Sequence, residues 1–173
     1  MITGIFFPDE GEIIFDGKKF DPVNDIIRIG YMPEERGLYK KMKIGEQALY
    51  LARLKGLNRA DAMAKIKEWF VKLEMQSWWN KKVEDLSKGM SQKLQFVTTV
   101  LHEPKLIILD EPFSELDRYS EDCLIKYFSQ LASHGKIIIL ITHNKESLLL
   151  CNKIISLDEK RSALIGDIDT WLS

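Results

Sequence analysis

Residues 103–173 alternate short apolar runs with helical stretches, and this alternation constrains the fold more than any other feature. The apolar runs lie at 106–109, 137–141 and 153–157, separated by helical patterns at about 121–132 and 145–150. Strands that are apolar along their whole length are typical of a parallel sheet covered by helices on both faces. The second half therefore predicts a β-α-β-α-β core of the α/β class.

The first half predicts two short strands followed by a helical block. The strands are expected at residues 12–15 and 26–32, each bounded by turn-forming residues. A helical apolar period then runs over 44–75, with Asn58 as a helix cap. A further helix is expected over 87–102, before a proline ends it.

The organisation predicted by these patterns is one domain with an insertion. The chain of 173 residues suits a single compact domain. The strand pattern is interrupted between about residues 44 and 102, which indicates a helical subdomain inserted into an α/β core that 103–173 completes.

Composition excludes several classes of function. Hydrophobic residues make up 45% of the chain and charged residues 29%, as in folded globular proteins. The net charge of -1 provides no basic field for nucleic acid, so no nucleic-acid partner is expected. No apolar run approaches the roughly 20 residues of a membrane helix, and the start lacks the basic region of a signal peptide. A cytoplasmic location is expected, and the two cysteines, which lack metal-ligand spacing, are assigned no chemistry.

Two adjacent carboxylates follow the apolar run at 106–109. Asp110 and Glu111 would lie at the carboxyl edge of a parallel sheet, where open α/β sheets bind their ligands. Asp110 is a candidate ligand for Mg²⁺, and Glu111 a candidate to orient or deprotonate an attacking water. The alternative is an acidic turn after a core strand.

The helix expected from residue 87 opens on the sequence LSKGM, residues 86–90. The hydroxyl of Ser87 and the free amides around Gly89 would point out of a helix N-terminus, which is an anion site. Lys88 adds positive charge there. The alternative is an ordinary serine N-cap.

One histidine follows the apolar run at 137–141. His143 is a candidate to contact a γ-phosphate and the attacking water. The alternative is a structural histidine in a loop, which is also how His102 and His134 are interpreted.

In order and spacing these motifs resemble the nucleotide-binding domain of ABC ATPases. LSKGM resembles the family's LSGGQ signature, and LIILDE at 106–111 its Walker B motif with the catalytic glutamate. SELD at 114–117 resembles the D-loop, and His143 the switch histidine. Upstream, IGYMPEERGLY at 29–39 resembles the Q-loop segment, particularly that of ABC-2-type exporters. The resemblance spans essentially the whole chain and implies a P-loop NTPase-like parallel sheet with an inserted helical subdomain.

The resemblance implies an ATPase that powers a membrane transporter, with ATP and Mg²⁺ as its ligands. It implies catalytic roles for Glu111 and His143. The implied ligand contacts are Mg²⁺ at Asp110 and Glu34, and nucleotide at Ser87, Lys88, Gly89, Glu34 and Asp117. Two ATPase domains would dimerise head-to-tail, and a transmembrane permease would dock near residues 34–39 and the helical block, at the cytoplasmic face of the membrane.

Three departures from the family pattern stand out. Lys88 and Met90 replace residues of a strict LSGGQ, although Ser87 and Gly89 remain. Glu34 stands where the family usually has glutamine, although a carboxylate also accepts hydrogen bonds from metal-bound water. No stretch matches G-x-x-x-x-G-K-[ST], the loop whose amides and lysine hold the β- and γ-phosphates. In the resemblance, residues 2–11 follow that loop by about two helical turns.

The missing loop leaves three functions open. The chain belongs to a transporter ATPase, export-type by resemblance, and is inactive by itself; or it is a non-catalytic interaction module; or it is a soluble ABC ATPase of translation or DNA repair. A natural truncation and a start at an internal methionine both remain open. The transported substrate is not encoded in these motifs.

The missing loop also bears on the sheet. The resemblance places the strand that leads into the loop between 106–109 and 137–141. An empty slot would hold these two strands about 9.6 Å apart with unpaired backbone groups. We therefore expect the two strands to pair directly, another segment to fill the slot, or the helices to shift inward.

Overall fold

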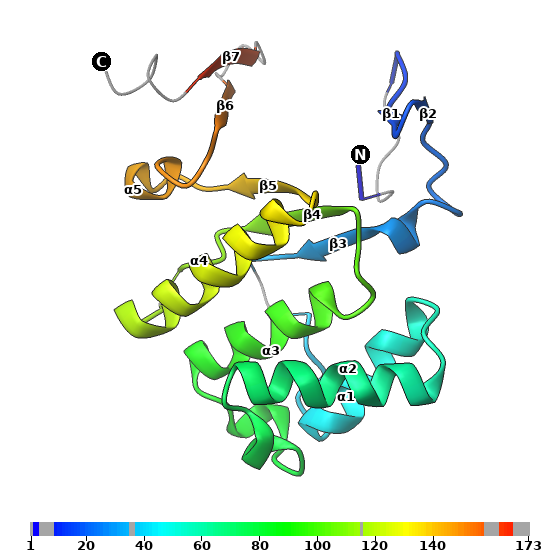
Figure 1. Cartoon of the computed structure of the whole chain (residues 1–173), viewed down its shortest axis with the longest axis vertical. Helices are drawn as coiled ribbons and strands as arrows, with labels where there is room; N and C mark the ends of the chain where they lie inside the picture. The colour runs from blue at the N-terminus through cyan, green and yellow to red at the C-terminus, as the bar shows by residue number, and fades with distance from the viewer. Residues whose placement is uncertain (1, 4–8, 35–36, 115, 158–162, 168–173) are drawn as a thin grey trace.

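The chain folds around a three-stranded parallel sheet (Figure 1). The computed structural model describes residues 2–3, 9–34, 37–114, 116–157 and 163–167. The strands are β3 (Ile29–Met32), β4 (Leu106–Asp110) and β5 (Ile137–Ile141), in the order β3-β4-β5. The central strand β4 is buried from its first residue to its fourth, as its apolar sequence predicts.

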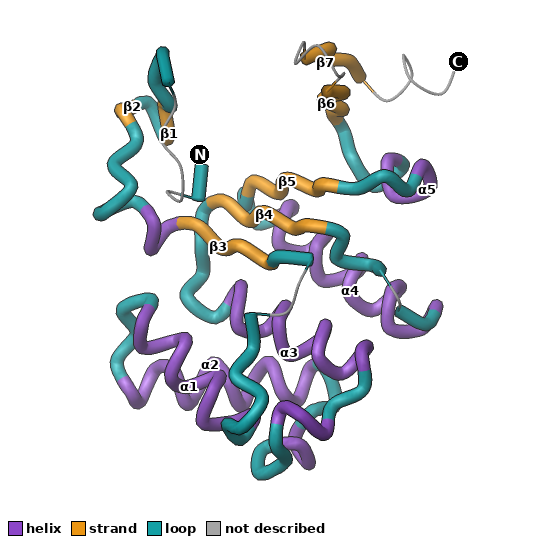
Figure 2. The backbone as a smooth tube through the Cα atoms, turned by 180° about the vertical axis from the view of Figure 1, so that it is seen from behind, coloured by secondary structure: helices purple, strands orange, loops and turns teal. Residues whose placement is uncertain are grey.

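Four helices lie on one side of the sheet. They are α1 (Ile44–Leu54), α2 (Arg59–Lys72), α3 (Lys88–Val100) and α4 (Arg118–Ser133). On this side α3 contacts β3, and α4 contacts β5. Figures 1 and 2 show from opposite sides that α1, α2 and α3 form a layer below the sheet. The predicted Asn58 cap is confirmed, because its side chain accepts a hydrogen bond from the Asp61 amide at 2.9 Å. None of the helices among the described residues is both long and apolar enough to cross a membrane.

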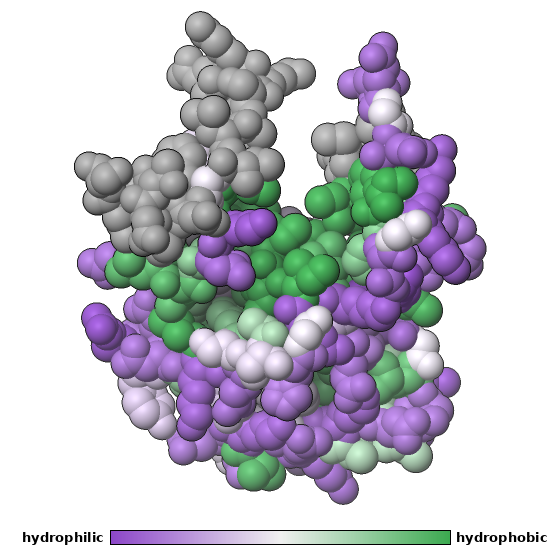
Figure 3. All heavy atoms as spheres, turned by 45° about the horizontal axis from the view of Figure 1, so that its top comes forward, coloured by the Kyte–Doolittle hydropathy of each residue, from purple (hydrophilic) through white to green (hydrophobic). Residues whose placement is uncertain are grey.

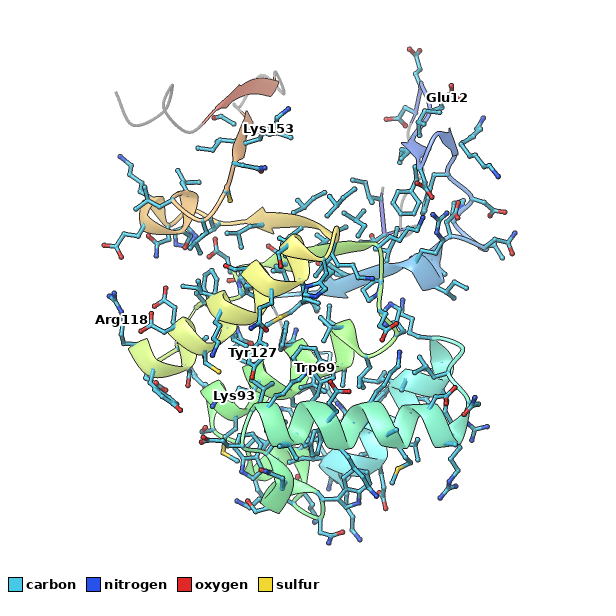
Figure 4. The ribbon with its side chains drawn as sticks, in the orientation of Figure 1. Glu12, Trp69, Lys93, Arg118, Tyr127 and Lys153 are labelled. Carbon is cyan, nitrogen blue, oxygen red and sulfur yellow. The ribbon has the colours of Figure 1, made fainter. Side chains whose placement is uncertain are left out.

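An aromatic cluster fixes α2, α3 and α4 to one another. Phe96 of α3 is fully buried, and its ring lies 5.3 Å from the rings of both Trp69 and Phe128. Trp69 and Tyr127 face each other across α2 and α4 at 5.3 Å (Figure 4). The Tyr127 hydroxyl also donates to the backbone carbonyl of Lys72 at 2.9 Å. Edge-to-face aromatic pairs add about 0.5–1.5 kcal/mol beyond the area they bury, so these three helices pack as one unit.

The opposite face of the sheet is only partly covered. Phe20 and the hairpin of β1 (Ile14–Phe15) and β2 (Lys18–Lys19) pack over Leu106 and Ile108. Towards β5 the surface becomes open and apolar, as Figure 3 shows in green. Ile137 and Ile141 at the ends of β5 are 58% and 47% exposed. The prediction of a sheet buried on both faces is therefore correct for β4 and wrong for β5.

Several predicted elements differ in extent. Residues 26–28 form a 3-10 helix, so the strand expected at 26–32 begins only at Ile29. The block expected at 44–75 is two helices, separated at residues 55–58. Helix α5 (Lys145–Leu148) is shorter than the expected 145–150.

The last predicted strand does not join the parallel sheet. β6 (Lys153–Leu157) pairs antiparallel with β7 (Ala163–Asp167), a strand that the sequence patterns did not indicate. A parallel crossover needs a dozen or more residues, usually with a full helix. The connection from β5 to β6, residues 142–152, contains only the one-turn helix α5. It is at the short limit for such a crossover, and β6 pairs with β7 instead.

The slot expected between the Walker B-like strand and the strand before His143 does not exist. β4 and β5 pair directly along their whole length, from Leu106 with Ile137 to Asp110 with Ile141. This is the first of the three expected outcomes. Because β4 and β5 are hydrogen-bonded neighbours, no strand can lie between them. The position expected for the strand that leads into the phosphate-binding loop is therefore wrong. Within the described part of the chain, β5 pairs with β4 along one edge, and its other, outer edge has no strand partner.

Candidate functional site

The three parallel strands bring three predicted site residues to one edge of the sheet. Met32 pairs with Leu109, and Asp110 pairs with Ile141. Glu34, Glu111 and His143 come directly after these ends, and the ends of neighbouring parallel strands meet at one edge. The register thus orders the three residues as the strands are ordered, with Glu111 in the middle.

Glu111 and His143 are in direct contact. Glu111 Oε1 lies 2.7 Å from His143 Nδ1 and accepts a hydrogen bond from the His143 backbone amide at 2.7 Å. Its second oxygen, Oε2, accepts from the Thr142 hydroxyl at 3.1 Å. The Glu111 side chain is only 14% exposed, whereas that of His143 is 91% exposed. The pair therefore joins a sheltered carboxylate to a ring that faces solvent.

The backbone at Glu111 has an uncommon conformation. Its φ of 44° lies in the left-handed region, which non-glycine residues seldom adopt. Its amide donates to the carbonyl of Ile141 at 2.9 Å, which extends the β4–β5 ladder by one residue. Such conformations cost about 1–3 kcal/mol and cluster at functional sites. The turn directs the Glu111 side chain towards Thr142 and His143.

Asp110 is held by a residue that sequence reasoning missed. The hydroxyl of Tyr31, on β3, donates to Asp110 Oδ2 at 3.3 Å. Burial, and then the neighbouring Asp110 charge, raise the pKa of Tyr31, so the hydroxyl keeps its proton and acts as donor. A carboxylate at a strand end fits Mg²⁺, a hard cation that prefers oxygen ligands. No group of three or more potential metal ligands occurs among the described residues.

The signature-like residues form a second cluster, where α3 and α4 begin. Ser87 caps α3 by accepting a hydrogen bond from the Met90 amide at 3.2 Å, and Lys88 is the exposed first residue of that helix. A side chain at Gly89 would come within 3.9 Å of an Asp117 carboxylate oxygen. This is an ordinary van der Waals separation, so the starts of α3 and α4 adjoin at Gly89 without their spacing requiring a glycine.

Asp117 has a structural role at this second cluster. It caps α4, with one oxygen accepting from the Ser120 amide at 2.9 Å and the other from the Ser120 hydroxyl at 3.0 Å. These hydrogen bonds, the backbone one first, lower the pKa of Asp117. Of the D-loop-like sequence, Glu115 lies outside the described residues, as do residues 35–36 of the Q-loop-like segment and 4–8 of the start.

Other missed residues hold the two carboxylate loops in place. Thr142 contacts Glu111, and two buried glutamines of α3, Gln92 and Gln95, donate to backbone carbonyls beside Glu111 and Glu34. The signal for the glutamines is their position three residues apart within the apolar face of a helix. A polar pair there needs hydrogen-bond partners, which the sequence alone does not locate.

Together the edge of the sheet and the two helix starts define an α/β protein with a parallel sheet. Carboxylates and a histidine meet where its parallel strands end, which is where open α/β sheets bind their ligands, and Ser87 caps the start of α3.

Comparison with known proteins identifies the family. The family described as "ABC transporter" matches residues 1–114, and the chain belongs to this family. It is 42% identical over 171 residues to the uncharacterized ABC transporter ATP-binding protein YhaQ of Bacillus subtilis (strain 168), covering 97% of this chain and 56% of that protein. It is 34% identical over 161 residues to the ABC transporter ATP-binding protein NatA of the same organism, covering 90% of this chain and 65% of NatA.

Solved structures agree in fold. A structure described as the ATP binding subunit of an ABC transporter superposes with a TM-score of 0.87 at 28% identity, covering 98% of this chain and 72% of that one. The cbiO1 protein from Clostridium perfringens, part of the ABC transporter complex cbiONQ, superposes with a TM-score of 0.81 at 22% identity, covering 99% of this chain and 71% of cbiO1. The chain spans 56% and 65% of the lengths of YhaQ and NatA.

Proposed function

We propose that this chain is part of an ATP-hydrolysing subunit that powers a membrane transporter. The observation that carries the proposal is the pairing of Glu111 with His143, at 2.7 Å, directly beyond the end of β4. A sheltered carboxylate held by a histidine is suited to orient and deprotonate a water molecule that attacks phosphate. The match to the ABC transporter family over residues 1–114 supports this assignment.

The other site residues take complementary roles in this proposal. Mg²⁺, when bound, would neutralise charge on the phosphates, and Asp110 and Glu34 would hold it, largely through water. Ser87, Lys88 and Gly89 would offer the start of α3 to the ATP of a second, head-to-tail ATPase domain. Asp117, which adjoins Gly89, would lie at the same contact between domains.

A transmembrane permease is the proposed partner. The surface beside Glu34 supports this, because Tyr39 and Tyr50 are 51% and 42% exposed and their rings lie 5.9 Å apart. An open groove adjoins them on α1 and the start of α2. It is lined by Glu46, Leu49, Tyr50, Arg53, Leu54 and Arg59. Exposed aromatic residues beside charged ones are typical of protein interfaces. The PEERGLY sequence at 33–39 favours an export-type transporter by its resemblance, at the cytoplasmic face of the membrane.

The 173 residues do not by themselves contain the motif that cradles the β- and γ-phosphates. We propose that these residues supply the hydrolytic and signature parts of the site, and that a phosphate-binding loop from outside them completes it. This proposal explains why Asp110 and Glu111 are in place at the edge of the sheet although the 173 residues contain no G-x-x-x-x-G-K-[ST] sequence.

The test uses a form of the protein that carries a phosphate-binding loop. Steady-state hydrolysis of Mg·ATP is measured for this form, for Glu111→Gln, and for Glu68→Gln as a control on the exposed side of α2. We expect Glu111→Gln to bind ATP and lose hydrolysis, because an amide keeps the shape but cannot accept the proton of water. Near-normal turnover of Glu111→Gln would place the base elsewhere. A form with the loop that binds no nucleotide would favour the interaction module.

A further inference from the structure

A stripe of polar side chains runs along the buried side of α3. Gln92, Gln95 and Thr99 are only 4%, 3% and 5% exposed, although glutamine and threonine are mostly surface residues. Each reaches across to the backbone of another element. Gln92 Nε2 donates to the carbonyl of Pro112 at 3.3 Å, and Gln95 Nε2 donates to that of Pro33 at 2.5 Å. Thr99 Oγ1 donates at 3.4 Å to the carbonyl of Tyr31.

The two carbonyls that the glutamines hold belong to particular residues. Pro112 directly follows Glu111, and Pro33 directly precedes Glu34. Both carbonyls lie just beyond the ends of β4 and β3, where the sheet no longer provides hydrogen-bond partners. α3 is therefore bonded to both carboxylate-bearing loops, and by a different side chain in each case.

Stability alone does not explain these glutamines. Oε1 of Gln92 and Oε1 of Gln95 are buried without a hydrogen-bond partner among the described residues. A carbonyl can only accept, so each amide must turn its nitrogen to the proline, which leaves its oxygen unpaired. An unpaired buried oxygen offsets most of what the single hydrogen bond contributes. A methionine of similar length would fill the same space and remove the unpaired oxygen, but it would leave the proline carbonyl without its donor.

We propose that Gln92 and Gln95 are positioning residues. Gln92 fixes the loop that carries Glu111 relative to α3, and Gln95 does the same for the loop that carries Glu34. The proposal rests on the proposed function, in which α3 begins at the Ser87 contact with a second ATPase domain. A displacement of α3 on closure of that contact would be transmitted to Glu111 through Gln92 and to Glu34 through Gln95. Because the aromatic cluster joins α3 to α2 and α4, a displacement of α3 would involve these neighbouring helices as well.

The two links are separable, which makes the proposal testable on the 173-residue chain. Gln95→Met, Gln92→Met and the control Thr98→Val are compared by NMR. Thr98 is on the same helix, but within the described residues its hydroxyl donates to the Gln95 carbonyl of α3 itself. The readouts are the carbonyl ¹³C shifts of Pro33 and Pro112, which report hydrogen bonding, and amide exchange at Glu34 and at Phe113.

We expect Gln95→Met to move the Pro33 shift and speed Glu34 exchange by about fivefold or more. Gln92→Met should do the same at Pro112 and Phe113, and Thr98→Val should do neither. Gln95→Glu is a conservative variant that should restore the hydrogen bond to the Pro33 carbonyl at low pH, because a protonated carboxyl can donate and an ionised one cannot. Its Pro33 shift should change from wild-type-like to methionine-like as the pH rises. Unchanged shifts in all variants, or equal changes along the whole of α3, would overturn the proposal.

A second arm measures hydrolysis in the form that carries a phosphate-binding loop. We expect Gln92→Met to lower kcat by about fivefold with KM for ATP little changed, because it acts on Glu111. Gln95→Met acts on the proposed Mg²⁺ ligand Glu34, so it should lower kcat by a similar factor and also raise KM. If the parent form shows no hydrolysis, the proposed function fails while the NMR result still decides whether the links exist. If the parent is active and the variants match it in kcat, the positioning role alone is wrong.

Discussion

Glu111 accepts two hydrogen bonds from the single residue His143, one from its backbone amide and one from ring Nδ1, both at 2.7 Å. The ring must carry a proton on Nδ1 to donate this bond. In the neutral ring Nε2 is then an acceptor, on a side chain that is 91% exposed. The ring thus presents a hydrogen-bonding atom to whatever occupies the edge of the sheet, while the backbone contact holds Glu111 independently of the ring.

This separation makes His143→Ala informative. In a form that carries a phosphate-binding loop, the backbone bond should keep Glu111 near its position, so ATP binding should change little. Hydrolysis should fall by about 100-fold, the scale of a lost proton-transfer or orienting group. Binding is measured by calorimetry and turnover by phosphate release. A variant that loses binding more than turnover would contradict the assigned role.

Asp117 combines a capping role, which the structure shows, with the proposed role at the contact between domains. Asp117→Ala should lower the free energy of unfolding by about 1 kcal/mol, because Ser120 loses its capping partner. Asp117→Ser keeps a capping oxygen and should be near wild-type in urea unfolding. If Asp117 also acts between domains, both variants should weaken ATP-dependent dimerisation in the form with the loop. Normal dimerisation by Asp117→Ser would leave capping as its whole role.

His102 makes stability depend on pH. Burial, and then the charge of Lys55, lower its pKa from 6.5 to about 4. The unfolded chain therefore binds a proton below about pH 6.5, whereas the folded chain binds it only near pH 4. Above pH 6.5 His102 should not lower the free energy of unfolding. As the pH falls towards 4, that free energy should decrease by up to about 3 kcal/mol. Urea titrations across this range measure the loss.

The matched variants for this prediction are His102→Gln and His134→Gln. His102 Nε2 contacts the Ile29 carbonyl at 3.2 Å, and a glutamine nitrogen reaches a similar position. His102→Gln should therefore fold and show a flatter pH profile between 4 and 6.5. His134→Gln, at an exposed residue at the end of α4, is the control for replacing a histidine elsewhere in the chain. Equal slopes for His102→Gln and wild type would show that other groups control the acid sensitivity.

The 173-residue chain should bind Mg·ATP only weakly. A phosphate-binding loop contributes several charge-assisted hydrogen bonds, each worth about 1.5–3 kcal/mol, and losing them moves a micromolar site beyond the millimolar range. Isothermal calorimetry compares the chain with a form that includes the loop. Millimolar or tighter binding by the chain alone would mean that its own residues hold the phosphates.

The elements predicted correctly are those whose signal is local. The apolar run of β4, the Asn58 cap and the serine cap of α3 each follow from a few neighbouring residues. The edge of the sheet that joins Glu111 to His143 also followed, because parallel strands end at the same side.

The errors concern relationships between distant segments. The predicted strand β6 pairs with β7, which has no strong strand pattern in the sequence. The hydrogen bond from Tyr31 to Asp110 joins residues 79 positions apart, and that from Gln95 to Pro33 joins residues 62 apart. Such pairs depend on packing geometry, which a single sequence does not display.

The outer edge of β5 has a practical consequence for anyone who purifies these 173 residues. Ile137 and Ile141 are largely exposed on a strand of five apolar residues, and no strand in the described part of the chain pairs with that edge. An uncharged, apolar strand edge is a template on which other chains add strands. Concentrated samples should therefore self-associate through β5. A lysine in place of Ile137 would be the first change to make for a solution study, since a charge on an edge strand opposes such growth.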